Sequence, residues 1–315
     1  MPIDAAGALG AAPRVREIAW DHKDVLLYHL GIGIGAGRPA TDPRELRYTL
    51  ESRLHVLPSF ATVAGGGAPG VIAALSMPGV DVDLAQVLHG GQRLRLHRPV
   101  PVRGRASAAS RVVAAYDKGT AAVLVLRTEV TDADGPLWTD EAEVYVRGEG
   151  GWGGDRGPSG RPSPPPAGPP DHVAEHALRE DQALLYRLSG DWNPLHADPE
   201  FAARAGFERP VLHGLCTYGA TLRTVVDTLL DGDVSRVRAY RTRFAGVVYP
   251  GETLRVRMWW PAGAGGAGAG GAGTDGGGAG GTGAGRTGTG EVRVTVSAVE
   301  RDDAAVLADT VVRYG

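Results

Sequence analysis

The sequence predicts an α+β fold, a double hot dog, in which two antiparallel sheets each wrap around a long helix. Three observations predict it. Each half of the 315-residue chain places a helical stretch before several alternating strands. A segment rich in Gly and Pro, at 148–170, separates the halves and cannot form a helix or a central strand. The long stretch 214–230 carries a helical apolar stripe through Leu215, Leu222 and Val226.

The strands are expected in two series with similar spacing. They lie near 92–98, 102–116, 121–131 and 137–147 in the first half, and near 237–249, 254–260, 292–299 and 306–314 in the second. Because these runs follow one another about ten residues apart, they predict antiparallel meanders. We therefore divide the chain into a first hot-dog half at 12–147, a linker at 148–170 and a second half at 171–315.

Composition excludes several classes of protein. A net charge of −3 provides no basic excess for a nucleic-acid backbone. The single cysteine, Cys216, excludes a disulfide framework and a multi-thiolate zinc site, and we expect it to be a small buried apolar residue. No apolar run is long enough to span a membrane, and no signal peptide or peroxisomal tripeptide is recognisable. We expect a cytoplasmic protein.

The segment 190–196, GDWNPLH, carries the chemistry. It places Asp191, Asn193 and His196 on a turn that Gly190 and Pro194 make tight. A carboxylate beside an imidazole is suited to general acid–base catalysis. The same three residues can also cap a helix and bond to the backbone, and the turn alone leaves both interpretations open.

Gly214 begins the long predicted helix. The first N–H groups of a helix lack internal partners and carry partial positive charge, so they can stabilise an oxygen that develops negative charge. A glycine lets a ligand approach that backbone closely. The preceding His213 is expected to be a packed or capping residue.

The run 31–36, GIGIGA, fits a dinucleotide-binding fingerprint. That motif must follow a strand and open a helix. Here the preceding residues look helical, and the Pro-containing residues 38–43 cannot form a helix interior. The sequence therefore argues against nicotinamide binding.

The stretch 186–199, with Ala-Gly-Phe at 205–207 and PVLHGLC at 210–216, resembles the (R)-specific 2-enoyl-CoA hydratases, or hydratase 2 enzymes, of the MaoC-like dehydratase family. These include the hydratase 2 part of the peroxisomal multifunctional enzyme. Further similar segments lie at 24–33, 57–60, 87–90, 117–119, 243–245 and 248–251, so the resemblance covers most of the chain. Without a peroxisomal signal, the Ala-, Gly- and Arg-rich composition indicates a bacterial protein.

The resemblance implies roles for particular residues. Asp191 and His196 become the catalytic pair, Asn193 positions water or substrate, and the Gly214 N–H is the oxyanion donor to the thioester carbonyl. It implies no metal or cofactor, an acyl-CoA substrate and a homodimer. Only the second half holds the D-x-N-x-x-H pattern, so one active site per chain is expected.

Substrate-binding residues are expected in both halves. By resemblance, Tyr28 and Glu51 line the pocket from the first half. Glycines at 65–70 interrupt the expected central helix there; this break either opens room for an acyl chain or is only a surface loop. The CoA phosphates need cations, and Arg241 and Arg243 are candidates. Two alternatives remain: a hot-dog thioesterase, which the fold does not exclude, and a non-catalytic acyl-CoA binder.

The segment 262–290 is nearly pure Gly, Ala and Thr, has no apolar group to bury and joins two predicted strands. We predict that replacing it with a short Asn-Gly turn preserves activity and preserves or raises the melting temperature, because loop-closure entropy falls as a loop shortens. Turnover and thermal unfolding of the shortened protein test this. A large loss of turnover in a folded variant would show that the segment contacts the site or a partner.

Overall fold

The computed structural model describes residues 3–66, 75–158, 161–260 and 288–315. Most of the glycine-rich insertion predicted at 262–290, and residues 67–70 of the interrupted first-half helix, lie outside this described part. The strands on either side of the insertion are described, and they pair with each other from Trp259↔Arg293 to Leu254↔Ala298. The predicted connection between neighbouring strands is therefore confirmed.

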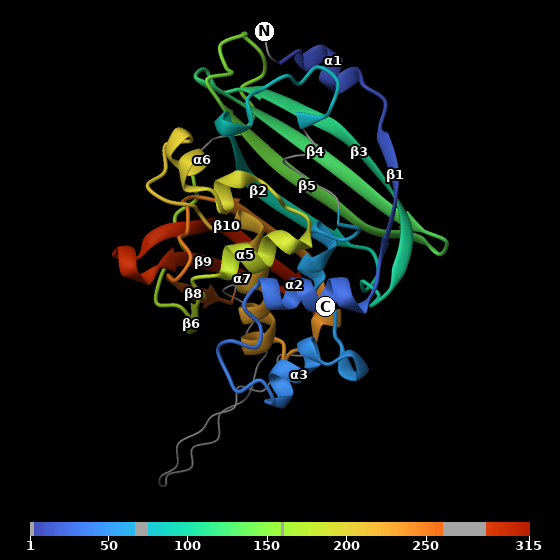
Figure 1. Ribbon diagram of the computed structural model, residues 1–315, viewed down its shortest axis with the longest axis vertical. Coiled ribbons are helices and arrows are strands. Elements are labelled where there is room, and N and C mark those ends of the chain that lie inside the picture. The colour runs from blue at the N-terminus through green and yellow to red at the C-terminus, as the bar shows by residue number, and fades with distance from the viewer. Residues whose placement is uncertain (1–2, 67–74, 159–160, 261–287) are drawn as a thin grey trace, which may run out of the picture.

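Ten antiparallel strands form one continuous curved sheet (Figure 1). They are β1 Arg14–Trp20, β2 Val87–Leu96, β3 Gly104–Asp117, β4 Ala121–Asp132, β5 Gly135–Arg147, β6 His172–Ala177, β7 Val237–Phe244, β8 Thr253–Trp259, β9 Gly290–Ala298 and β10 Ala304–Tyr314. Their order across the sheet is β1-β3-β4-β5-β2-β7-β10-β9-β8-β6. Read from each outer edge inward, the two halves have the same order, β1-β3-β4-β5-β2 and β6-β8-β9-β10-β7. The chain therefore builds one motif twice and joins the copies at β2 and β7.

This order corrects the prediction in two respects. The strands are not simple meanders, because β2 and β7 each return beside the last strand of their own half. The two sheets are also not separate, because β2 pairs with β7 from Gly91↔Arg243 to Arg95↔Ala239. The edge strands β1 and β6 were not predicted: β1 is mostly exposed and lacks a clear alternation, and β6 has only six residues.

The helices gather on one face of the sheet, with α2, α5 and α7 over its middle (Figure 1). The described α-helices are α1 Ala5–Gly10, α2 His22–Gly31, α3 Pro43–Thr49, α5 Gln182–Tyr186, α6 Pro199–Arg204 and α7 Gly214–Leu229. Short 3-10 turns lie at Glu51–Arg53, Pro58–Thr62, Leu84–Gln86, Arg187–Ser189, Pro194–His196, Val234–Arg236 and Val299–Arg301. Of the described helices, none is long and apolar enough to cross a membrane.

The long helix α7 is buried on nearly every side, not only along the predicted apolar stripe. Its apolar residues pack into the largest core cluster, together with residues of both halves. A helix buried all round lies inside a protein rather than on its surface. At Gly219 the absence of a side chain is required, because a Cβ would lie 2.4 Å from the Tyr28 Oη of α2.

A buried ion network ties α7 to the first half. The Arg223 guanidinium hydrogen-bonds to the carboxylate of Glu45 in α3 and forms an ion pair with Asp227, 2.9 Å away. Glu45 is fully buried, and Arg38 lies 3.3 Å from the same carboxylate. The Tyr48 hydroxyl donates to Asp227 over 3.0 Å. Each charge in this network therefore has a partner of opposite sign.

The predicted linker at 148–170 follows the surface of the sheet through local anchors. The Asp117 carboxylate accepts hydrogen bonds from the N–H groups of Gly151 and Gly153, which with Gly119 lower the pKa of Asp117 to about 2. Farther along, the Ser163 N–H donates to Asp309 on β10 over 2.9 Å. Backbone hydrogen bonds, together with the Trp152 side chain packed against a core cluster, hold this Gly- and Pro-rich segment.

We predict that Arg223→Ala lowers the free energy of unfolding by about 3 kcal/mol. The buried Glu45 carboxylate then keeps only the partly exposed Arg38 as a cationic partner among the described residues. Replacing both residues, as Glu45→Met with Arg223→Leu, should recover much of this loss, since no buried charge at position 45 then remains. Denaturant unfolding measures both effects. The exposed Arg238→Ala serves as control, with a change of about 0.5 kcal/mol or less. Equal effects of Arg223→Ala and Arg238→Ala would contradict this role.

Candidate active site

The segment between α5 and α7 forms a tight turn over the start of α7. It leaves the Arg187–Ser189 turn through Gly190, whose φ of +115° lies in the left-handed region. A Cβ at Gly190 would also lie 2.8 Å from the Gly66 carbonyl oxygen of the first half. Both the backbone conformation and this close approach require glycine here.

Three side chains converge at this turn. One carboxylate oxygen of Asp191 and one ring nitrogen each of His196 and His213 all lie within 4.8 Å of one another. The sequence predicted the first two members of this group. His213 was assigned only a packing or capping role, and its position directly before Gly214 was the one signal that placed it near the site.

His196 is oriented by the backbone. Its Nδ1–H donates to the Val211 carbonyl over 2.8 Å, so Nε2 is left as the acceptor. Burial lowers the pKa of His196, whereas the nearby Asp191 carboxylate raises it. The neutral imidazole with a lone pair on Nε2 is the form that can take a proton from water.

His213 supports both catalytic candidates. Its ring stacks on that of His196, with the centroids 3.7 Å apart and the planes 29° apart. Its Nε2–H donates to the Asp191 carbonyl over 3.2 Å. Burial, with the neighbouring His196, keeps the pKa of His213 well below its usual range, so the ring is neutral at neutral pH.

The side chain of Asn193 caps the short turn Pro194–His196. The Asn193 Oδ1 accepts from the Leu195 N–H over 3.0 Å. The backbone N–H of Asn193 donates to Asp191 Oδ1 over 3.1 Å. The capping interpretation therefore describes Asn193 Oδ1. The His196 Nδ1–H also bonds to a backbone group, the Val211 carbonyl, so a structural role accounts for this bond too, and the catalytic interpretation rests on Nε2.

Gly214 is the first residue of α7, and His213 is its N-cap without a side-chain capping bond. A Cβ at Gly214 would lie 2.9 Å from Cε1 of Phe244. The N-terminal end of the helix thus faces Phe244 and the turn that carries Asp191 and His196. Cys216, one turn into the helix, is buried and its thiol donates to the Gly31 carbonyl, while burial raises its pKa. The expectation of a buried, unreactive thiol agrees with this environment.

The other predicted residues lie in three different places. Tyr28 is buried, donates to Ser59 Oγ over 2.8 Å, and packs 6.1 Å from the Tyr186 ring, which lies 4.9 Å from the His213 ring. One aromatic ring, Tyr186, therefore separates Tyr28 from the cluster. Glu51 is exposed in the turn Glu51–Arg53 and, among the described residues, makes no hydrogen bond or ion pair with the cluster.

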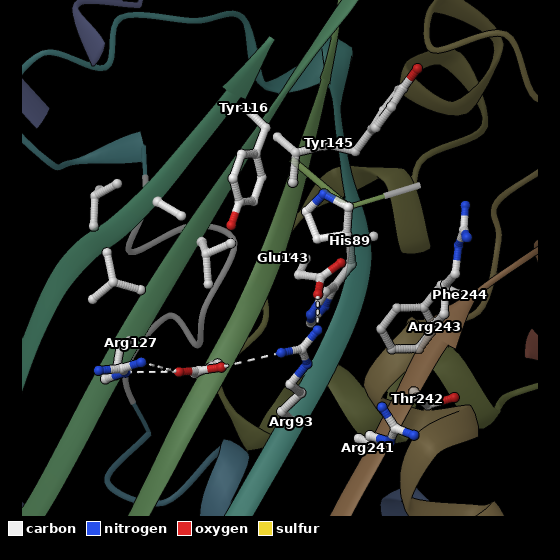
Figure 2. Close-up of a pocket in the computed structure, with 18 of the residues that line it drawn as sticks. His89, Arg93, Tyr116, Arg127, Glu143, Tyr145, Arg241, Thr242, Arg243 and Phe244 are labelled. Atoms are coloured by element: carbon white, nitrogen blue, oxygen red, sulfur yellow. Dashed lines mark hydrogen bonds and ion pairs between the residues drawn. The ribbon is translucent and has the colours of Figure 1, made fainter. Parts of the chain in front are cut away.

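Arg241 and Arg243 lie on β7 and line a groove of about 1460 Å³, shown in Figure 2. The groove also contains Phe244, the residue that faces Gly214. The two arginines therefore lie outside the Asp191 turn. Phe244, which lines the groove with them and also faces Gly214, lies between the two places.

The cluster of Asp191, His196 and His213 has a spacing at which a metal ion could also bind. However, two of its four ring nitrogens already bond to backbone carbonyls, and the two imidazoles stack face to face. The remaining groups, a carboxylate and a neutral imidazole, match an acid–base pair.

Comparison with known families covers both halves of the chain. Residues 162–268 match the MaoC like domain, and residues 19–148 match the MFE-2 hydratase 2 N-terminal domain. An enoyl-CoA hydratase of Mycobacterium tuberculosis, ChsH3, is 50% identical over 260 residues, which cover 82% of this chain and 90% of that protein. The chain belongs to the MaoC-like hydratase family.

Solved structures agree with this assignment. A MaoC-like dehydratase from Phytophthora capsici is 25% identical and superposes with a TM-score of 0.78, covering 99% of this chain and 98% of its own. A Mycobacterium tuberculosis protein described as having a double hotdog fold is 15% identical, with a TM-score of 0.55 over 96% of this chain and 95% of its own. The predicted family and the double hot-dog fold are thus confirmed for this MaoC-like protein.

We predict that Asp191→Asn and His196→Gln each lower kcat by ~10²–10⁴-fold, the usual range for general acid–base catalysis. The double variant should lose little more than either single one, because groups that act as one unit are not additive. Enoyl thioester turnover and melting temperature are measured on the same preparations. If the residues only cap the turn, melting temperature falls while the folded fraction keeps its turnover. Normal kcat in folded His196→Gln would contradict a catalytic role.

Proposed function

We propose that this protein catalyses the reversible hydration of trans-2-enoyl-CoA to (3R)-3-hydroxyacyl-CoA in fatty-acyl-CoA metabolism. The observation that supports it is the convergence of the Asp191 carboxylate and the His196 imidazole beside the N-terminal end of α7. Similarity to enoyl-CoA hydratase ChsH3 and to the MFE-2 hydratase 2 domain supports the same reaction.

The chemistry follows from these groups. The Gly214 N–H polarises the thioester carbonyl and stabilises the enolate oxygen that forms. Asp191 and His196 hold one water molecule, and one of them takes its proton as the water oxygen bonds to C3. The electron pair of the C2–C3 double bond passes to the enolate, and a proton returned by the pair forms the C2–H bond. One water is consumed, and both catalytic groups regain their starting protonation states.

The first half has a different role in this proposal. Its segment 12–147 lacks the catalytic motif and supplies the acyl-chain pocket, with Tyr28 on its wall, while residues 171–315 supply the chemistry. Asn193 uses Oδ1 in the turn, so its Nδ2 group is the part that orients water or substrate. Glu51 is kept as a proposed pocket residue because of its place in the family resemblance.

The cellular setting and the oligomeric state are also part of this proposal. The buried free thiol of Cys216 is typical of a reducing compartment, and we propose the cytoplasm. A homodimer is proposed because family members of this fold form dimers.

Incubation with crotonyl-CoA tests the proposal. The hydratase removes the absorbance band of the enoyl thioester without releasing free thiol. Release of free CoA in a parallel thiol assay would identify a thioesterase. If neither changes while crotonyl-CoA still binds, the protein is an acyl-CoA binder, and the proposed reaction is wrong.

The product should have the 3R configuration. Coupling the reaction to a 3S-specific 3-hydroxyacyl-CoA dehydrogenase should give no NADH, whereas a 3R-specific dehydrogenase should give one NADH per product molecule oxidised. A 3S-producing hydratase serves as positive control for the first coupling enzyme. Rapid NADH formation with the 3S-specific enzyme would contradict the stereochemical assignment.

A further inference from the structure

The groove of about 1460 Å³ lies mainly on the face of the sheet opposite α7 (Figure 2). Successive side chains of a strand point to opposite faces. On β5, Ala142 and Val144 belong to the buried side, whereas their neighbours Glu141, Glu143 and Tyr145 line the groove. The same alternation on β4 places Arg127 in the groove.

One row across the floor of this groove is unusually basic. Strand pairing places Arg111 opposite Arg127, Arg127 opposite Glu141, Glu141 opposite Arg93, and Arg93 opposite Arg241. These five residues on β3, β4, β5, β2 and β7, which we term the arginine row, combine four cations with one carboxylate. Glu141 pairs with Arg127 at 2.7 Å and lies 3.9 Å from Arg93, so it is shared by two of them.

Like charges directly opposite each other on neighbouring strands destabilise a sheet. The arginine row contains two such contacts, Arg111 with Arg127 and Arg93 with Arg241. Among the described residues, neither Arg111 nor Arg241 has a hydrogen bond or ion pair with a carboxylate. The unfavourable pairs are relieved if an anion binds between them.

The groove as a whole is also positively charged. Seven Lys and Arg side chains line it against three carboxylates, so four positive charges are in excess. The complete chain has the opposite sign, with a net charge of −3. The positive charge is therefore concentrated at this place and not a general property of the surface.

The groove reaches the active site at the junction of the two halves. Pairing between β2 and β7 ends at Gly91↔Arg243, next to a bulge at Gly90. Beyond this point His89 and Phe244 pack together, with ring centroids 4.7 Å apart, and both line the groove. Phe244 also faces Gly214, as the 2.9 Å approach shows. The Phe244 ring therefore lies between the groove and the proposed oxyanion donor.

We propose that the arginine row binds the phosphates of the 3′-phospho-ADP end of the CoA thioester, with the pantetheine arm passing His89 and Phe244 toward Gly214. This inference rests on the proposed function and names the nucleotide subsite of the same reaction. The nucleotide carries about four negative charges at neutral pH, which matches the excess of four positive charges. Arg241 lies three residues from Phe244, about 10 Å along the strand.

Aromatic rings complete the subsite. Tyr116 and Tyr145 line one end of the groove, while Arg93, Arg127 and Arg241 lie toward the other (Figure 2). An adenine ring has an extended π face that stacks on tyrosine. The groove thus offers an aromatic end for the base and a basic end for the phosphates.

Two substrates separate nucleotide recognition from catalysis: crotonyl-CoA and the crotonyl thioester of N-acetylcysteamine, which lacks the nucleotide. For the variant Arg111→Gln with Arg241→Gln, the ratio of kcat/KM for the first substrate to that for the second should fall at least ~10-fold, because charge-assisted bonds to phosphate are lost. Binding of 3′,5′-ADP, measured by calorimetry, should weaken by about the same factor.

The matched control removes two charges elsewhere on the sheet. Arg16→Gln with Arg105→Gln changes two exposed arginines on β1 and β3 that do not line the groove. Its substrate ratio and its affinity for 3′,5′-ADP should match those of the wild type within about twofold. Equal losses in both double variants would indicate a general effect of charge and overturn the proposal.

The remaining outcomes are distinct. An unchanged ratio and an unchanged affinity for 3′,5′-ADP in the groove variant overturn the subsite. If the ratio is unchanged while light scattering shows a lower molecular mass, a second copy of the chain covers the groove instead. If wild type hydrates neither thioester, the proposed function fails, and binding of 3′,5′-ADP alone then decides whether the arginine row is a nucleotide site.

Discussion

The pairing of β2 with β7 is the contact on which the rest of the molecule depends. It joins two copies of one five-stranded motif into a single sheet. The strand pairing between the copies runs from Gly91↔Arg243 to Arg95↔Ala239. This junction places α7 of the second half against α2 and α3 of the first, so the long helix is enclosed by both. The buried Arg223 is stable in this helix because the Glu45 carboxylate of the first half pairs with it.

The same junction explains how one half can carry the proposed catalytic motif while both halves shape its surroundings. Gly190 packs on the Gly66 carbonyl, and Tyr186 lies between Tyr28 and His213. The first half therefore supports the catalytic turn from behind. Burial lowers the pKa of both His196 and His213, so both rings are neutral at neutral pH. A neutral base beside a carboxylate is suited to holding one reactive water molecule.

Local features were predictable from the sequence. Gly190 and Pro194 forecast a tight turn, and Asp198 with Pro199 forecast the start of α6, where the Asp198 carboxylate accepts from the Glu200 N–H over 2.9 Å. These features depend on residues close in sequence. The D-x-N-P-x-H spacing likewise indicated Asp191 and His196, because a six-residue turn holds its own ends near each other.

Features that depend on distant residues were not predictable in the same way. Alternating apolar residues show that β2 and β7 are strands but not that they pair, since pairing partners are set by the complete fold. His213 looked like a capping residue because its stacking partner, His196, lies seventeen positions earlier. The arginine row is invisible in sequence because its five members come from five separate strands and only the register aligns them.

The central claim is that Asp191 and His196 act from one side of the substrate on one water molecule. Their reacting atoms lie within 4.8 Å in a single cluster, so oxygen and proton must reach C3 and C2 from the same face. Hydration of crotonyl-CoA in D₂O, followed by NMR of the product, tests this directly. The account predicts a single diastereomer at C2, with deuterium and the C3 hydroxyl added to the same face. Addition to opposite faces, or a mixture at C2 formed in the first turnovers, would contradict it.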